Sequence, residues 1–180
     1  HMVRVIVTSS AYRQSSAPRH DLDEIDPYNK LIARQSRFRL PAEFVRDTAL
    51  EVAGLLSGEV GGPPVKPYQP DGYYNDCNTF RGPIIYNTAQ GNEQYRRGLY
   101  TYWKRSFPHP SMLAFDAPSR EECVAVRPAS NTPLQALVLL NDPTYVEAAR
   151  VFAERILREG GTDTTARLQW AFQRALGRAA

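Results

Sequence analysis

The chain has 180 residues, of which 42% are hydrophobic and 23% are charged, a composition typical of a globular protein with a core of its own. The net charge is +3 and no run of four consecutive Lys or Arg residues occurs, so nucleic-acid binding is disfavoured. No stretch approaches the roughly 18 consecutive apolar residues of a membrane span.

The two ends and the two cysteines bound the organisation of the chain. His1-Met2 has the look of an expression scar, so we expect a single domain over residues 3–180, excised from a longer protein. Cys77 and Cys123 stand 46 positions apart and match no metal or haem spacing. Whether they are bonded to each other stays open at this point, as does the compartment.

The first half of the chain predicts one clear helix. Residues 3–8 (VRVIVT) fit either a β-branched strand or a helix cut short, and Asp26 can cap a short helix over residues 27–34. Pro41 stands at the first position of a longer helix that should end near Ser57. The core stripe of this helix is expected to be Val45, Ala49, Val52 and Leu56, with Phe44 and Ala53 beside it.

A long irregular arm is predicted over residues 58–93. Between residues 58 and 83, ten of 26 residues are Gly or Pro, which removes backbone donors and helix propensity together. The arm has room for one short β-hairpin. Residues 94–105 (QYRRGLYTYWKR) alternate in part and favour a short strand.

Residues 130–177 predict the helical core. In residues 134–140 only Gln135 is polar, so this helix should be buried on all sides. Asp142 and Pro143 then form the cap and first turn of an amphipathic helix. We expect its buried stripe to be Val146, Ala149, Phe152, Ala153, Ile156 and Leu157. The fold class is therefore mainly α, a compact helical domain crossed by the Pro/Gly/Tyr-rich arm.

Six blocks in order carry a resemblance to a known family. They are YRQSS (residues 12–16), RFRLPAEFVRD (37–47), VKPYQP (65–70), RRGLYTYWKR (96–105), FDAPSRE (115–121) and NTPLQALVLLNDP (131–143). Together they resemble the uncharacterised C-terminal domain of large planctomycete and verrucomicrobial proteins that also carry cytochrome-c-like domains. The resemblance covers nearly the whole chain.

The resemblance implies a context rather than a reaction. The family has no established activity to carry over, and its parent proteins are expected to be exported to the periplasm or the cell surface. Haem is expected in another domain of the parent, because this chain has no CxxCH. No cofactor is expected in this domain, and its partners would be the other domains of the parent protein.

Two carboxylates on one predicted helix are candidates for acid–base chemistry. Glu43 and Asp47 are four residues apart and share a helix face, and paired carboxylates can divide acid and base roles when their environments separate their pKa values. Asp116 is a third candidate. The competing interpretation is a solvated helix face compensated by Arg46 and Arg39.

Scattered basic residues predict a binding pocket. If they converge on the helical core, they can hold an anion or a sugar, with Trp103, Tyr100, Tyr102, Tyr73 and Tyr74 as stacking platforms. Salt bridges that hold long loops to the body explain the same residues. Asp116 and Arg120 belong to the same scattered group. The candidate ligand-binding residues are Arg13, Lys66, Trp103, Lys104, Arg105 and Arg127.

The remaining polar residues favour ordinary structural roles. Gln135 and Asn141 are expected to satisfy neighbouring backbone groups. His20 and His109 lie in proline-flanked loops without metal-ligand spacing, so no metal site is expected.

Two functional hypotheses follow from different classes. The first is a non-catalytic accessory or interaction module of a large exported cytochrome-c-like protein, binding an anionic or sugar ligand or a partner domain. The alternative is a hydrolase-type domain that acts on glycans through paired carboxylates. The two differ in geometry, since an enzyme of this kind needs two carboxylates about 5–10 Å apart in one concave pocket.

Overall fold

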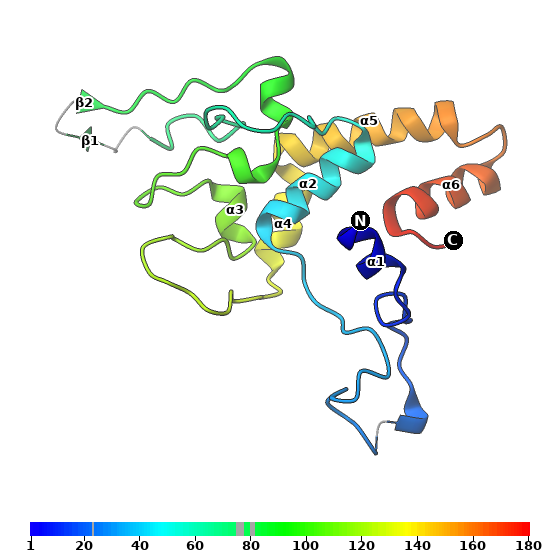
Figure 1. The fold of residues 1–180 in the computed structure, drawn as a ribbon. Coiled ribbons are helices and arrows are strands. Elements are labelled where there is room, and N and C mark those ends of the chain that lie inside the picture. Colours follow the sequence, from blue (N-terminus) through cyan, green and yellow to red (C-terminus); the bar gives the residue numbers. More distant parts are fainter. Residues whose placement is uncertain (23, 75–77, 80–81) are drawn as a thin grey trace. The chain divides into compact units, whose positions relative to one another are not determined.

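The computed structural model describes residues 1–22, 24–74, 78–79 and 82–180 (Figure 1). The mainly α fold class is confirmed: six α-helices carry the regular structure, and the paired strands are two residues each. The chain divides into two compact units, His1–Arg39 and Leu40–Ala180, and each is described by itself. The expectation of one domain over residues 3–180 stays a prediction.

The N-terminal unit consists of a short helix and a run of turns. Residues 3–8, which fitted either a strand or a helix, belong to helix α1 (Met2–Thr8). None of its residues is buried. A 3₁₀ turn, η1, follows at His20–Leu22. The predicted helix over residues 27–34 is wrong. Asp26 accepts from the N–H groups of Lys30 (2.8 Å) and Leu31 (2.7 Å), so side-chain bonds replace a helical ladder there.

The second unit is organised by helices α2 (Ala42–Ala53) and α5 (Pro143–Glu159), which pack against each other. Helix α3 (Pro110–Ala114) packs on α2, and α4 (Pro133–Asn141) and α6 (Thr164–Leu176) pack on α5. Between α2 and α3 run the arm and two 3₁₀ turns, η2 (Gly91–Tyr95) and η3 (Gly98–Tyr100). A small apolar cluster of Ala42, Met112 and Ala117 joins α2 to α3, with Trp103 and Phe115 packed against it.

Helix α2 lies where it was predicted, but it starts one residue later, ends earlier and buries a different face. Pro41 is its N-cap, and Gly54 ends it in the left-handed region at φ +80°, before the predicted end near Ser57. The buried positions are Ala42, Arg46, Leu50 and Ala53. A charged side chain therefore stands in the middle of the inward stripe, where the sequence pattern placed it on the solvent side.

The prediction that residues 134–140 are buried on all sides is wrong. In α4 only Gln135 is buried, while Leu137 is 55% and Leu140 is 72% exposed. The Gln135 amide donates to the carbonyl oxygen and hydroxyl of Ser130, so the polar residue takes the inward position. Helix α4 packs on α3 and α5, and most of its apolar side chains are exposed.

Helix α5 begins as predicted. The Asp142 carboxylate accepts from the Thr144 N–H at 2.8 Å, and Pro143 is the first helical residue. Its buried face is rotated from the predicted one, because Tyr145 and Ala148 are buried. Of the predicted stripe, Phe152 and Ile156 are half-buried, whereas the others are exposed: Val146, Ala149, Ala153 and Leu157.

The arm contains the expected hairpin, and the strand predicted at residues 94–105 is wrong. Strands β1 (Asn78–Thr79) and β2 (Gly82–Pro83) pair antiparallel, with Asn78 opposite Pro83 and Thr79 opposite Gly82. Residues 94–105 contain the end of η2 and the whole of η3 instead. Their remaining sheet character is one parallel bridge between Val65 and Thr101 and one between Ser57 and Arg96.

Within the described residues, no helix combines the length and apolar character that crossing a membrane requires.

Candidate functional site

The two carboxylates predicted on α2 are both engaged in contacts with other segments. Glu43 forms an ion pair with Arg127 (Oε2 to Nη1, 2.8 Å), and Asp47 accepts from the Gly98 N–H at 2.6 Å. Burial raises the pKa of Asp47 above its ordinary value, although the Gly98 hydrogen bond and the charge of Arg46 act in the opposite direction. In these contacts both carboxylates join distant segments to α2.

Asp116 also has a tethering role. Its backbone lies in the left-handed region at φ +60°, and its carboxylate accepts from the N–H (2.7 Å) and the hydroxyl of Ser130. Trp103, a predicted ligand-binding residue, is likewise held by contacts within the protein. Its indole N–H donates to the Ser119 carbonyl at 3.1 Å, and the Arg120 guanidinium lies 4.4 Å from the centre of its ring.

The predicted basic residues of the second unit lie in different surroundings. The Lys66 ammonium lies over the rings of Tyr86 (5.5 Å) and Tyr102 (5.3 Å), and Lys104 lies over Phe107. Arg127 is paired with Glu43, and Arg105 is exposed. Arg13 is exposed and belongs to the N-terminal unit.

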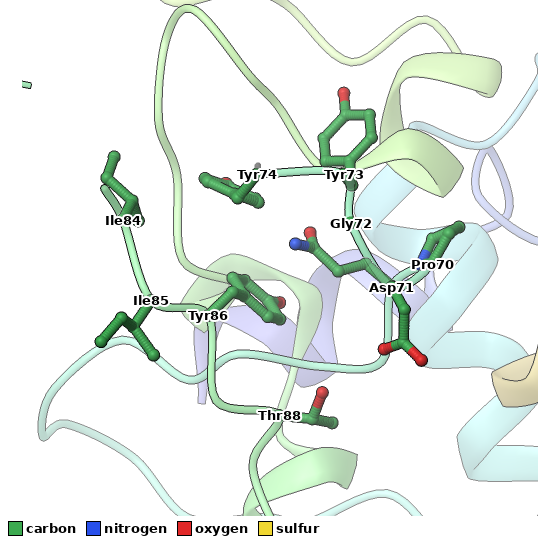
Figure 2. Close-up of a pocket in the computed structure, with 10 residues that line it drawn as sticks. Pro70, Asp71, Gly72, Tyr73, Tyr74, Ile84, Ile85, Tyr86 and Thr88 are labelled. Atoms are coloured by element: carbon green, nitrogen blue, oxygen red, sulfur yellow. The ribbon is translucent and has the colours of Figure 1, made fainter. Parts of the chain in front are cut away.

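A cleft of about 350 Å³ lies between two segments of the arm, residues 69–74 and residues 84–88 (Figure 2). This volume is at the small end of the range of about 300–1,000 Å³ for small-molecule sites. In Figure 2 the rings of Tyr74 and Tyr86 lie next to each other, whereas the Tyr73 ring points away from Tyr86. None of the six predicted ligand-binding residues lines this cleft, which we call the arm cleft. Its lining residues are 69–74, 84–86 and 88.

Three tyrosines form the aromatic wall of the arm cleft. The Tyr74 and Tyr86 rings are stacked, with centroids 5.2 Å apart and planes at 22°, and Tyr73 meets Tyr74 edge-on at 5.6 Å. Their hydroxyl groups donate to backbone carbonyls: Tyr73 to Pro108, Tyr74 to Phe107 and Tyr86 to Pro67. These bonds fix the rings, and burial raises the pKa of Tyr86 above its ordinary value.

Gln69 is the unusual lining residue. It is only 5% exposed, and its side-chain oxygen has no hydrogen-bond partner in the part of the chain that the structure describes. A buried acceptor without a partner costs about 1–3 kcal/mol, so this amide calls for an explanation. Two further polar side chains line the arm cleft, the exposed carboxylate of Asp71 and the hydroxyl of Thr88.

Two buried arginines hold the base of the arm in place. Arg46, 2% exposed, donates through Nη1 to the Arg96 carbonyl (2.6 Å) and through Nη2 to the Gln94 carbonyl. Arg96 in turn donates to the carbonyls of Pro63 (3.1 Å) and Gly61. Burial lowers the pKa of Arg46, opposed chiefly by the negative charge of Asp47.

Hydrogen bonds also join the two sides of the arm, between residues 66–67 and residues 85–89. The Ala89 N–H donates to the Lys66 carbonyl at 2.8 Å, and the Lys66 ammonium donates to the Ile85 carbonyl at 3.2 Å. Together with the Tyr86 bond to Pro67, these contacts bring residues 84–88 beside residues 69–74. The arm is irregular in secondary structure but extensively hydrogen-bonded.

The histidine and cysteine side chains bear on the sequence-based questions of metal binding and disulfide formation. His109 is buried, and one of its ring nitrogens lies 2.7 Å from the Tyr68 carbonyl; burial lowers its pKa. The described residues contain no group of three or more His, Cys, Asp or Glu side chains that could hold a metal. Cys123 is a free, exposed thiol, and Cys77 lies outside the described residues.

Part of the arm cleft was predictable from composition. Tyr73 and Tyr74 were expected as stacking platforms, and both line it. Gln69 and Asp71 were missed. The available signal was the run YQPDGYY, in which polar residues alternate with proline, glycine and tyrosine.

Comparison with known proteins identifies the family of the chain. The family described as PSD1, protein of unknown function (DUF1553), matches residues 1–180. The chain therefore belongs to this family. Searches of curated proteins and of solved structures gave no match.

Proposed function

We propose that this chain is a non-catalytic accessory module that binds a neutral sugar in the arm cleft. The observation that carries the proposal is the buried Gln69 amide, whose oxygen lacks a partner in the described residues beside the stacked rings of Tyr74 and Tyr86. A sugar matches both features at once. Its C–H faces pack on aromatic rings, and its hydroxyl groups donate and accept hydrogen bonds.

The charges near the arm cleft favour a neutral ligand over an anionic one. Asp71 is the one carboxylate among the described lining residues, and it would repel an anion. The basic residues predicted to hold an anion have other contacts: Lys66 lies over Tyr86 and Tyr102, and Arg127 pairs with Glu43. Hydroxyl donors suit the acceptor groups of Gln69 and Asp71.

Hydrolysis of glycans has weaker support than binding. Most glycoside hydrolases place two carboxyl groups about 5–9.5 Å apart across the scissile bond. Asp71 alone supplies a carboxylate to the arm cleft among the described lining residues. The other candidates, Glu43, Asp47 and Asp116, are bonded to Arg127, Gly98 and Ser130.

We also propose the wider context from the sequence resemblance alone. In that context the module belongs to a larger exported protein, at the periplasm or cell surface of a planctomycete or verrucomicrobial cell. Haem would be held by a cytochrome-c-like domain elsewhere in that protein, and the other domains would be the partners of this one. The absence of CxxCH from this sequence agrees with haem being held elsewhere.

The test is a binding screen with matched variants. The probes are glucose, mannose, xylose and galactose and their linear β- or α-linked oligomers, measured by calorimetry and saturation-transfer NMR. We expect at least one neutral sugar to bind, and Gln69→Leu to weaken that binding about tenfold, which corresponds to about 1.4 kcal/mol. Gln69→Leu should leave stability unchanged or raise it, because an unpaired buried amide is replaced by an apolar side chain.

Gln169→Leu on α6 is the matched control, since the same change is made at an exposed position outside the arm cleft. This control should bind like the wild type. Absence of binding by every probe, or equal binding by the wild type and Gln69→Leu, would overturn the proposal.

A further inference from the structure

A second, smaller recess adjoins the arm cleft. Its volume is about 100 Å³, and its walls come from the arm, η2 and the first turn of α5. Its lining includes Tyr68, Thr88, Gln94, Tyr95, Thr144 and Glu147. We call it the α5 recess.

The α5 recess and the arm cleft share part of their lining. Thr88 lines both of them. The neighbouring residues Tyr68 and Gln69 divide between them, with Tyr68 in the recess and Gln69 in the arm cleft. In an extended segment, consecutive side chains point to opposite sides, so one short piece of chain supplies a wall to each space. Thr88 lines both spaces, so a ligand longer than one ring would pass from one to the other beside Thr88.

The chemistry of the α5 recess matches that of the arm cleft. The Tyr95 hydroxyl donates to Glu147 Oε1 at 3.0 Å, and burial together with this bond raises the pKa of Tyr95. The bond fixes the Tyr95 ring beside the recess and leaves acceptor capacity on the Glu147 carboxylate. Both spaces thus present tyrosine rings next to oxygen acceptors.

We propose that the ligand is a linear oligosaccharide, with one ring in the arm cleft and the adjacent ring contacting Tyr95 and Glu147 in the α5 recess. This inference rests on the proposed function and assigns the length of its ligand. The first ring packs on the half-buried ring of Tyr86 and bonds to Gln69. The oligosaccharide passes Thr88, and a hydroxyl group of the second ring donates a hydrogen bond to the Glu147 carboxylate.

The experiment compares affinities along a length series. The probes are the cello-, xylo-, manno- and malto-oligosaccharides of one to five units, titrated by calorimetry against the wild type and against Glu147→Gln and Tyr95→Phe. We expect affinity to rise about tenfold between the monosaccharide and the disaccharide, equivalent to about 1.4 kcal/mol, and then to level off. Both variants should lose most of that gain while binding the monosaccharide like the wild type.

Glu154→Gln is the control on the same helix, because Glu154 is exposed, pairs with Arg150 and is not among the residues that line the recess. It should follow the wild type at every length. Affinity that does not change with length, or equal loss of monosaccharide and disaccharide binding in Glu147→Gln, would overturn the assignment of the second ring while leaving sugar binding intact. Failure of every sugar to bind would overturn the proposed function itself.

Discussion

Arg46 is the residue on which the position of the arm depends most directly, and its replacement by methionine has a calculable cost. The side chain donates to two backbone carbonyls, those of Gln94 and Arg96, and is 2% exposed. Each hydrogen bond from a charged donor contributes about 1.5–3 kcal/mol, so the two together amount to about 3–6 kcal/mol. Removal of the buried charge offsets part of this loss, and we expect Arg46→Met to cost about 3–5 kcal/mol.

The assay is urea unfolding followed by circular dichroism, with limited proteolysis of residues 58–93 as a second readout. Arg46→Lys should fall between the wild type and Arg46→Met, because one ammonium cannot reproduce the forked geometry that reaches two carbonyls. Arg150→Met is the control, since Arg150 forms an exposed ion pair on α5, where such pairs contribute about 0–1 kcal/mol. Stability of Arg46→Met within about 0.5 kcal/mol of the control would refute the reasoning.

Three further changes test the fold. Gly98→Ala would place its Cβ 3.0 Å from the Glu43 Cα, so we expect a loss of about 1–3 kcal/mol, whereas Gly58→Ala meets nothing within 4 Å and serves as its control in the same unfolding assay. His109 has a pKa below its ordinary 6.5 when folded, so unfolding takes up a proton and stability should fall, by up to about 1.4 kcal/mol per pH unit, as the pH drops below 6.5 toward the folded pKa. His109→Gln should flatten that pH dependence, and an unchanged slope would contradict the assignment. Leu137→Ala should change stability by less than about 0.5 kcal/mol because the side chain is 55% exposed; a loss of several kcal/mol would place this leucine in the core after all.

Local signals were sufficient for the helices that begin with a cap and a proline. The Asp142-Pro143 pair fixed the start of α5, and Pro41 lies at the start of α2, as its N-cap. These signals involve neighbours within a few residues, so sequence alone contains them.

The burial of α4 was mispredicted because hydrophobic composition does not reveal how many neighbours a helix has. Four leucines in nine residues are typical of a helix that is enclosed, yet Gln135 alone is buried there. The same limitation affected α2, where periodicity assigned Arg46 to the solvent side. Its carbonyl partners, Gln94 and Arg96, lie about fifty residues further along the chain.

The candidate site was predictable only in its residue types. Tyrosines in the arm suggested stacking platforms, and Tyr73 and Tyr74 line the arm cleft. The role of Gln69 depends on residues 84–88 returning beside it, which the Tyr86 bond to Pro67 and the Lys66 contacts bring about. No local pattern encodes that return, so the unpaired amide was visible only in the structure.

The most direct test of sugar binding in the arm cleft is a calorimetric comparison of wild type, Gln69→Leu and Gln169→Leu against the neutral oligosaccharide that binds best. The account predicts equal affinity for the wild type and Gln169→Leu, and about tenfold weaker binding by Gln69→Leu with no loss of stability. Equal affinity for all three proteins would contradict it.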